Sequence, residues 1–350
     1  VLSALAEHGM VFHNAVTPSP LCAPARAALA TGRRYGRTGV PDNTVSFDLS
    51  HPTYYQHLRR VGYECAAVGK LDLHKPELDW GADGRRMLDE YGFTAGMDCE
   101  GKGDAVEAYL QAGKRPAGPY TRFLASGGLL NTHLRLYGSR VGDRENLEYP
   151  LISELPQDAY HDDWISNQAV RVLRGFSRAR PWHLSVNFAG PHDPFDATEP
   201  MWSEWAERRI PPPVDGEGTE DEPKQWQPKR RGYGADIENM DRLIGRILAA
   251  VEARGELEQT LVVYASDHGE MLGDHGLWGK RQWYAPSVGV PLVARGPGVC
   301  RGGESAALVD LHDLAATFLD YADAETLPGS DALSLRAVLS GGSRDHRTVA

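Results

Sequence analysis

Cys22, Pro24 and Arg26 stand at the start of a stretch whose composition is typical of a helix. Pro24 fits the first helical turn, because its missing N–H is not needed there and its φ angle is already helical. Alanine dominates residues 25–31, and Gly32 can end the helix in a left-handed conformation. We therefore expect Cys22 just outside a helix N-terminus, where free N–H groups favour negative charge. The stretch predicts an anion site that contains a thiol; the alternative is a buried, inert cysteine.

Lys70 and His74 follow a short buried strand predicted at residues 63–68. Gly62 ends the helical pattern before this strand. Polar side chains just past the carboxyl end of a strand are well placed for a ligand crevice in an open α/β sheet. The sequence therefore predicts that Lys70 and His74 contact a ligand, with an ordinary solvated loop as the alternative.

His192 follows another predicted strand, at residues 183–189, and lies between Pro191 and Pro194. Each proline fixes its own φ angle, so the loop is stiff and suits a side chain that needs one orientation. The loop therefore indicates a functional role for the His192 side chain. A structural loop histidine is the alternative.

Asp267 and His268 follow a third predicted strand, residues 260–265, which is apolar and β-branched as central parallel strands are. A carboxylate and an imidazole side by side at a strand end form half of a divalent metal site. The continuation is polar and rich in glycine, and it leads to Lys280.

The elements that must position these residues alternate along the chain as strand, loop and helix, which predicts one α/β domain over residues 1–350. Residues 236–255 show the clearest helical periodicity, with Asp236 as the expected cap. Residues 75–156 and 210–231 are rich in glycine, proline and charge, and we expect them to be loop insertions at the active edge of the sheet. Four basic residues of the first insertion either recognise an acidic substrate or are simply solvated: His133, Arg135, Arg140 and Arg144.

Composition excludes several classes of protein. The net charge is −11 and no long basic run occurs, so we expect no nucleic-acid partner. No apolar run is long enough to span a bilayer, and the first residues do not resemble a signal peptide. The spacing of Cys22, Cys65, Cys99 and Cys300 fits no zinc motif. If Cys22 is modified, an odd number of cysteines remains, which favours a reducing, cytoplasmic compartment.

Four motifs, in chain order, resemble those of the sulfatase family. Residues 22–32 match C-x-P-x-R followed by T-G, residues 191–195 match P-H-x-P-F, and residues 266–280 match S-D-[HN]-G…G-x-H-G…K. The segment after residue 69 resembles G-K-x-H, although Asp72 occupies the usual histidine position and His74 comes two residues later. The resemblance covers nearly the whole chain. It implies the alkaline-phosphatase-like fold, an α/β/α sandwich with a mostly parallel central sheet.

The resemblance also implies a role for each motif residue. In sulfatases a formylglycine-generating enzyme converts the motif cysteine into formylglycine, an aldehyde whose hydrate is the nucleophile. The implied ligands of a divalent metal are Cys22, Asp267 and His268. The metal would be Ca²⁺, with Mn²⁺ left open because His268 stands where asparagine is common. The implied catalytic residues are Cys22, Arg26, Lys70, His74, His192 and Lys280. The sequence does not choose among His192, Lys280 and His74 as the donor of the leaving-group proton.

The implied activity is hydrolysis of sulfate monoesters of a small molecule or a saccharide. One alternative is a phosphonate monoester or phosphodiester hydrolase of the same superfamily. Another is a catalytically silent fragment or binding protein. That alternative arises because sulfatases usually begin with a strand that ends in two metal-binding aspartates and finish in a small C-terminal subdomain. We expect both of these parts to be absent from this sequence.

Overall fold

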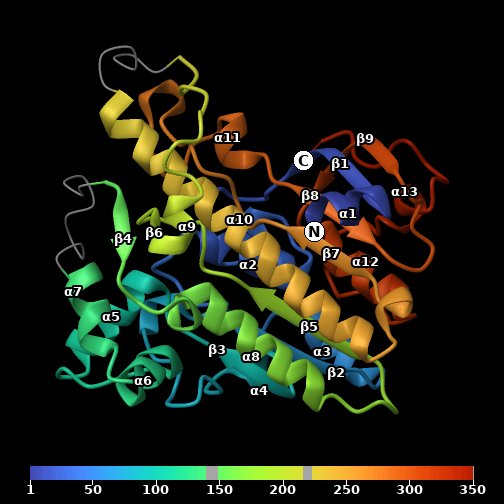
Figure 1. Ribbon diagram of the computed structural model, residues 1–350. Coiled ribbons are helices and arrows are strands. Elements are labelled where there is room, and N and C mark those ends of the chain that lie inside the picture. The colour runs from blue at the N-terminus through green and yellow to red at the C-terminus, as the bar shows by residue number, and fades with distance from the viewer. Residues whose placement is uncertain (139–148, 216–222, 350) are drawn as a thin grey trace.

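The computed structural model describes residues 1–138, 149–215 and 223–349, and Figure 1 shows how their helices and strands are arranged. The strands are β1 (Met10–Val16), β2 (Glu64–Gly69), β3 (Ala95–Asp98), β4 (Leu151–Ser153), β5 (Trp182–Asn187), β6 (Asp196–Thr198), β7 (Val262–Ala265), β8 (Leu292–Arg295) and β9 (Gly303–Asp310). The helices are α1 (Leu2–Glu7), α2 (Cys22–Thr31), α3 (Tyr54–Arg60), α4 (Leu88–Tyr91), α5 (Lys102–Gln111), α6 (Pro119–Ser126), α7 (Leu130–Gly138), α8 (His161–Gly175), α9 (Glu199–Ser203), α10 (Pro223–Ala253), α11 (Ala285–Val288), α12 (Asp313–Tyr321) and α13 (Arg336–Leu339).

The strands form two main sheets and one small one. The larger sheet has the order β7-β8-β1-β9, the second has the order β3-β2-β5, and β4 pairs with β6. All pairs are parallel except the two that involve β8. The prediction of a mostly parallel framework is therefore confirmed.

Strand β2 shows how helices cover both faces of the sheet. Cys65 and Ala67 belong to a buried cluster with α2, α3 and α12. The alternate residues Ala66 and Val68 pack on the opposite side, against α8 among others. Successive strand residues point to opposite faces, so a strand that is apolar throughout must be covered twice. Figure 1 shows α8 and α10 lying across the front of the sheet, which completes the α/β/α layering.

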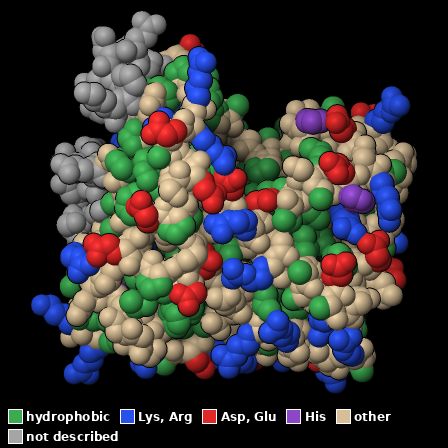
Figure 2. Space-filling view, viewed as in Figure 1, with side chains coloured by type: hydrophobic (Ala, Val, Ile, Leu, Met, Phe, Trp, Pro, Cys, Tyr) green, Lys and Arg blue, Asp and Glu red, His purple; other side chains and the backbone are tan. Residues whose placement is uncertain are grey.

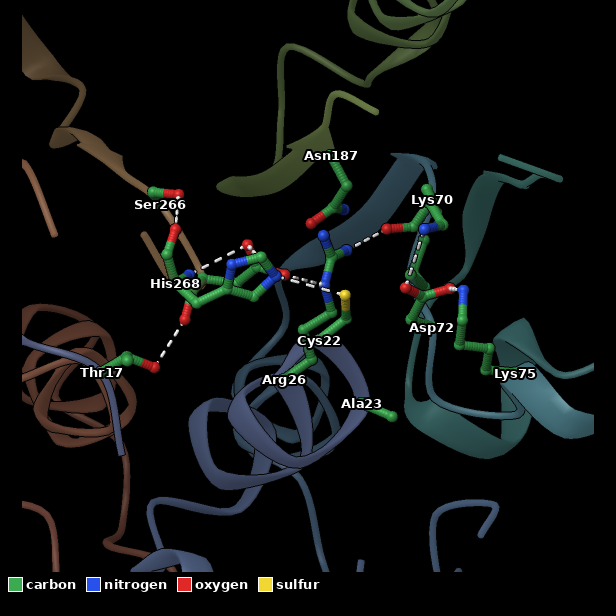
Figure 3. Close-up of polar contacts among 12 residues, drawn as sticks. Thr17, Cys22, Ala23, Arg26, Lys70, Asp72, Lys75, Asn187, Ser266 and His268 are labelled. Carbon is green, nitrogen blue, oxygen red and sulfur yellow. Dashed lines mark hydrogen bonds and ion pairs between the residues drawn. The ribbon is translucent and has the colours of Figure 1, made fainter. Parts of the chain in front are cut away.

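Strands β5 and β7 are each paired on one side only in the described parts of the chain. β5 is an end strand of one sheet and β7 is an end strand of the other. Every residue of these two strands is half-buried, whereas residues 65–69 of β2 are fully buried. Their carboxyl ends nevertheless reach the same place, because Asn187 and His268, which follows β7, both lie near the Arg26 guanidinium (Figure 3).

The structure corrects three expectations about loops and caps. The segment 75–156 is not a plain loop insertion, because it contains α4 to α7 and contributes β3 to the sheet. The segment 210–231 is helical from Pro223 onward, so Asp236 lies inside α10 and does not cap it. The sequence also predicts one strand over residues 287–295, but α11 occupies the start of this stretch and β8 begins only at Leu292.

Candidate active site

Helix α2 fixes Cys22 and Arg26 in place. Leu21 precedes it in an extended conformation, Cys22 is its first residue, and Gly32 ends it with φ 62°. Cys22 thus lies one residue further into the helix than predicted, and the left-handed end at Gly32 is confirmed. The alanines at positions 25, 27 and 28 are fully buried, because the narrow helix packs closely against α3 and α12. A helix held in this way presents Cys22 in one position.

The thiol of Cys22 lies among cations. Lys280 Nζ donates to Cys22 Sγ at 3.2 Å, and His268 Nε2 lies 3.3 Å from the same sulfur. Burial by itself would raise the pKa of the Cys22 thiol. The charge of Lys280 and hydrogen bonds with His192 and His268 outweigh it and hold the pKa well below its ordinary value. The environment therefore stabilises an anion at this atom.

Arg26 joins the carboxyl ends of two strands. Its Nε donates to Asp267 Oδ2 at 2.8 Å, and its Nη1 donates to the carbonyl oxygen of Lys70, which follows β2. Thr17 Oγ1 donates to the carbonyl oxygen of Asp267 at 2.5 Å, which holds the turn after β7. Burial would raise the pKa of Asp267, but the charges of His268 and Arg26 hold it far below the ordinary range. Asp267 is therefore a carboxylate at neutral pH.

In the described parts of the chain, one cluster of side chains could hold a metal ion, and it consists of Cys22, Asp267 and His268. Their ligand atoms lie within 4.8 Å of one another. His268 Nδ1 lies 2.8 Å from the carbonyl oxygen of Gly269. When Nδ1 donates its proton to this oxygen, the unprotonated Nε2 can face a metal. The three residues fit a divalent cation as part of its ligand set. The set includes an imidazole and only one carboxylate, so it differs from the six to eight oxygens typical of Ca²⁺.

Lys70 lies beside this group in a network of buried charges. Its Nζ is 3.2 Å from Asp72 and 3.6 Å from Asp104, and Lys75 contacts the same two carboxylates. Burial would lower the pKa of Lys70, but the charges of Asp72 and Asp104 hold it well above the ordinary value. Lys70 therefore stays cationic. Figure 3 shows Lys70 and Asp72 on the side of Arg26 opposite His268.

His74 does not reach the site. Its ring nitrogens lie 3.1 Å from the Asp79 carbonyl oxygen and 3.3 Å from the Tyr91 hydroxyl, in a buried pocket. Asp72 has φ 58°, and this left-handed turn brings its carboxylate next to Lys70 while His74 turns away. The structure therefore separates His74 from the other predicted catalytic residues.

His192 lies on a loop that is anchored at its base. Asp162 accepts hydrogen bonds from the backbone N–H groups of Ala189 and Gly190, at 2.8 and 3.0 Å. His192 Nδ1 lies 3.0 Å from Asp193 Oδ1, and the ring is hydrogen-bonded to Cys22. Burial and the charge of Lys280 would lower the pKa of His192, but Asp193 and Cys22 outweigh them and raise it above the ordinary value.

A cavity of about 460 Å³ opens at these residues. Lys70, Lys280 and His192 line it, together with Asn43, Trp278 and Arg281, which the sequence analysis did not single out. Asn43 accepts a hydrogen bond from the backbone N–H of Ala23 at 3.0 Å. Nothing in the sequence around Asn43 marks it, because the loop that carries it has no periodicity. Asn187 was also missed, although a polar residue at the end of a strand is a usable signal.

Of the basic residues expected to recognise an acidic substrate, the two that the structure describes, His133 and Arg135, do not line this cavity. His133 is buried, lies 3.1 Å from the carbonyl oxygen of Lys102, and has its pKa lowered by burial to about 3. Arg135 is exposed and pairs with Glu154 at 2.5 Å. Arg140 and Arg144 lie outside the described residues.

Comparisons with known proteins agree with this geometry. The family model described as Sulfatase matches residues 1–324. A choline-sulfatase of Rhizobium meliloti is 30% identical over 98% of this chain and 67% of its own length, and an arylsulfatase of Clostridium perfringens is 26% identical over 97% and 72%. Among solved structures, a phosphonate monoester hydrolase from Silicibacter pomeroyi superposes with a TM-score of 0.78 at 22% identity, covering 100% of this chain and 72% of the other.

These matches bear on fold and family. The architecture is the predicted alkaline-phosphatase-like α/β fold. No helix in the described parts of the chain is both long and apolar enough to cross a membrane. A family model that spans most of the sequence, together with a relative at 30% identity, shows that the chain belongs to the sulfatase family.

Proposed function

We propose that the chain hydrolyses sulfate monoesters through a formylglycine derived from Cys22, after conversion by a formylglycine-generating enzyme. The observation that carries the proposal is that Lys280 and His268 both lie within 3.3 Å of one buried cysteine at a helix start. The sulfatase family and the named sulfatase relatives support hydrolysis of sulfuric esters.

The charges around Cys22 suit this chemistry. A sulfate monoester is an anion, so a nucleophile that attacks it must be held against charge repulsion. Lys70 and Lys280 line the cavity and would bind the sulfate oxygens. Fixed cations gain most in the transition state, when charge moves to the leaving oxygen. The formylglycine hydrate supplies a hydroxyl nucleophile and a second hydroxyl through which the sulfate is released.

The metal ligands proposed are the residue at position 22, Asp267 and His268. A divalent cation bound there supplies Lewis-acid polarisation of a sulfate oxygen. Ca²⁺ is expected from the family resemblance, and the imidazole of His268 leaves Mn²⁺ or another transition metal open. Asp267 is already ionised and held in place by Arg26, so it needs no rearrangement to act as a ligand.

His192 and Lys280 are the two proposed donors of the leaving-group proton. Both line the cavity and both lie at Cys22, whereas His74 is buried elsewhere. A general acid must lie within hydrogen-bond reach of the atom that it protonates, and this condition favours His192 and Lys280 over His74.

Two measurements test the proposal. The chain is co-expressed with a formylglycine-generating enzyme, and its intact mass is expected to fall by about 18 Da, because SH and H are replaced by a carbonyl oxygen. Turnover of 4-nitrophenyl sulfate is expected to disappear in Cys22→Ala. It is expected to persist in the control variant Cys300→Ala, because Cys300 is a free cysteine outside the site. Retained turnover in Cys22→Ala would overturn the mechanism. A converted but inactive protein would favour the silent-protein alternative.

A phosphonate monoester hydrolase is the second candidate function. The observation that favours it is the imidazole of His268 next to Asp267, which suits metals used in phosphoryl chemistry. Rates on an aryl sulfate and an aryl phosphonate with the same leaving group separate the two candidates. A higher kcat/KM on the phosphonate would reverse our assignment.

A further inference from the structure

A second and larger cavity lies away from Cys22. It has a volume of about 880 Å³ and is bordered by the amino ends of β2 and β3 and by the end of α8. Glu64, the first residue of β2, lines it, whereas Lys70, just past the last residue of β2, lines the catalytic cavity. Six strand residues span about 20 Å, so this groove and the catalytic cavity lie at opposite ends of the same strand.

Arginines dominate the charge of this groove. The four that line it are Arg59, Arg85, Arg171 and Arg180. Only Arg59 has an ion pair with a described carboxylate, Asp89 at 2.7 Å, while the Arg85 guanidinium donates to the carbonyl oxygen of Thr94. Glu64 and Asp83 line the groove as well, so four arginines and two carboxylates give its lining a formal charge of +2 on a chain whose net charge is −11. Lys and Arg side chains gather along the lower edge of the molecule in Figure 2.

The rest of the lining is mixed. Tyr63, Met97 and Val172 offer aromatic and apolar surface, while Glu64, Asp83 and Gln168 offer oxygens and an amide. An inorganic anion would use only the arginines. A sugar ring has apolar C–H faces that pack on aromatic and aliphatic side chains, and hydroxyls that pair with carboxylates and amides. Sulfate groups on such a ring would pair with guanidinium groups, which bind tetrahedral oxyanions through two parallel hydrogen bonds.

We propose that this groove, bordered by β2, β3 and α8, is a non-catalytic binding site for a saccharide chain that carries several sulfate groups. The inference rests on the proposed function, since a sulfate ester hydrolase that acts on such a chain gains from a second contact with it. A chain held at the groove stays near the catalytic cavity after one ester is cleaved, which raises the effective concentration of the next.

The test uses a fluorescently labelled heparin hexasaccharide as the probe and measures its affinity by anisotropy at about 0.15 M salt, where exposed charges beyond about 8 Å are screened. The double variant Arg171→Ser/Arg180→Ser is expected to weaken binding at least tenfold, because it removes the two unpaired guanidinium groups. Arg174→Ser is the matched control. Arg174 is exposed on α8, the helix that carries Arg171, and does not line the groove. Lys280→Met, at the catalytic cavity, is expected to leave binding at the groove in place.

Turnover of 4-nitrophenyl sulfate separates this inference from the proposed function. The double variant is expected to keep wild-type turnover of this small ester, since neither arginine lies at the catalytic cavity. Loss of probe affinity with turnover intact supports the groove. Inactivity of the wild-type chain on sulfate esters counts against the proposed function alone, because the binding measurement does not depend on turnover.

Four results would overturn the groove assignment. Equal losses of probe affinity in Arg174→Ser and in the double variant would show that the probe is bound only by the overall surface charge and not by the groove. Loss of all binding in Lys280→Met would place the probe at the catalytic cavity. Equal affinity for single-stranded DNA of the same charge would show an unselective polyanion surface. Full competition by millimolar inorganic sulfate would show a simple anion site.

Discussion

Lys280→Met removes the cation that lies nearest to Cys22 and keeps a side chain of similar length. Lys280 Nζ is 3.2 Å from Cys22 Sγ, the atom that stands in for the hydroxyl oxygens of the converted residue. Two unit charges at this separation interact by about 5 kcal/mol at an effective dielectric constant of 20, which is an upper bound. Removal of one preorganised donor to a developing oxyanion costs about 2.7–4 kcal/mol in comparable sites. We therefore expect kcat to fall by about 10²–10³-fold.

Two assays measure this change independently. The first is turnover of 4-nitrophenyl sulfate by converted protein, with conversion verified by intact mass. The second follows the far-ultraviolet absorbance of the thiolate in unconverted protein as a function of pH. Lys280 is the strongest of the charges that lower the pKa of the Cys22 thiol, so Lys280→Met should raise that pKa.

The control and the refuting result are specific. Lys229→Met removes a cation that lies over the ring of Trp278; Trp278 lines the cavity, whereas Lys229 itself does not. It should change kcat by less than about twofold, because Lys229 does not line the cavity and its partly exposed charge contributes little there. If Lys280→Met leaves kcat and the thiol titration unchanged, the reasoning that Lys280 stabilises negative charge at position 22 is wrong.

Three further predictions concern the scaffold. Arg26→Ala leaves Asp267 without its partner, so unfolding should become easier by about 2–4 kcal/mol in urea titrations and sulfate ester turnover should be lost. Burial raises the pKa of Asp98 from 3.8 to about 8, so its ionisation destabilises the fold as pH rises from about 4 to 8. The free energy of unfolding of Asp98→Asn should therefore gain about 2–4 kcal/mol relative to wild type between pH 5 and pH 8. Parallel curves of unfolding free energy against pH for the two proteins would contradict this. Gly32→Ala should lower the free energy of unfolding by about 1–3 kcal/mol, because φ is 62° at this position. Gly36→Ala is the control and should change stability little, since there is open space around Gly36. Equal melting temperatures for the two variants would be inconsistent with strain at position 32.

The sequence predicts helix α2 well because local rules decide it. Pro24 stands in its first turn and Gly32 ends it, and both residues act through their own backbone angles. The strands that carry Lys70 and Asp267 were also predicted, because apolar runs that end in polar residues mark them. These features need no knowledge of the rest of the fold.

Long-range packing decides the features that the sequence did not predict. Strand β3 is only four residues long and contains Gly96, whose added Cβ would lie 1.9 Å from the carbonyl oxygen of Ala67, so its strand state depends on the neighbouring β2. His74 was expected at the site because spacing alone cannot reveal the left-handed turn at Asp72. The aromatic pocket that holds His74 is built by residues from a later part of the chain, such as Trp80 and Tyr91.

In the part of the chain that the structure describes, β5 and β7 each have one unpaired side, which has a consequence for how the protein behaves in solution. Amide protons that point away from a ladder lack a hydrogen-bonded partner and exchange with solvent quickly, so alternate amides of these two strands should exchange fast while those of β2 exchange slowly. An unpaired strand edge is also a template on which another strand can add. Self-association of the 350-residue chain should therefore begin at β5 and β7, and a charged residue facing solvent along either edge should improve its solubility.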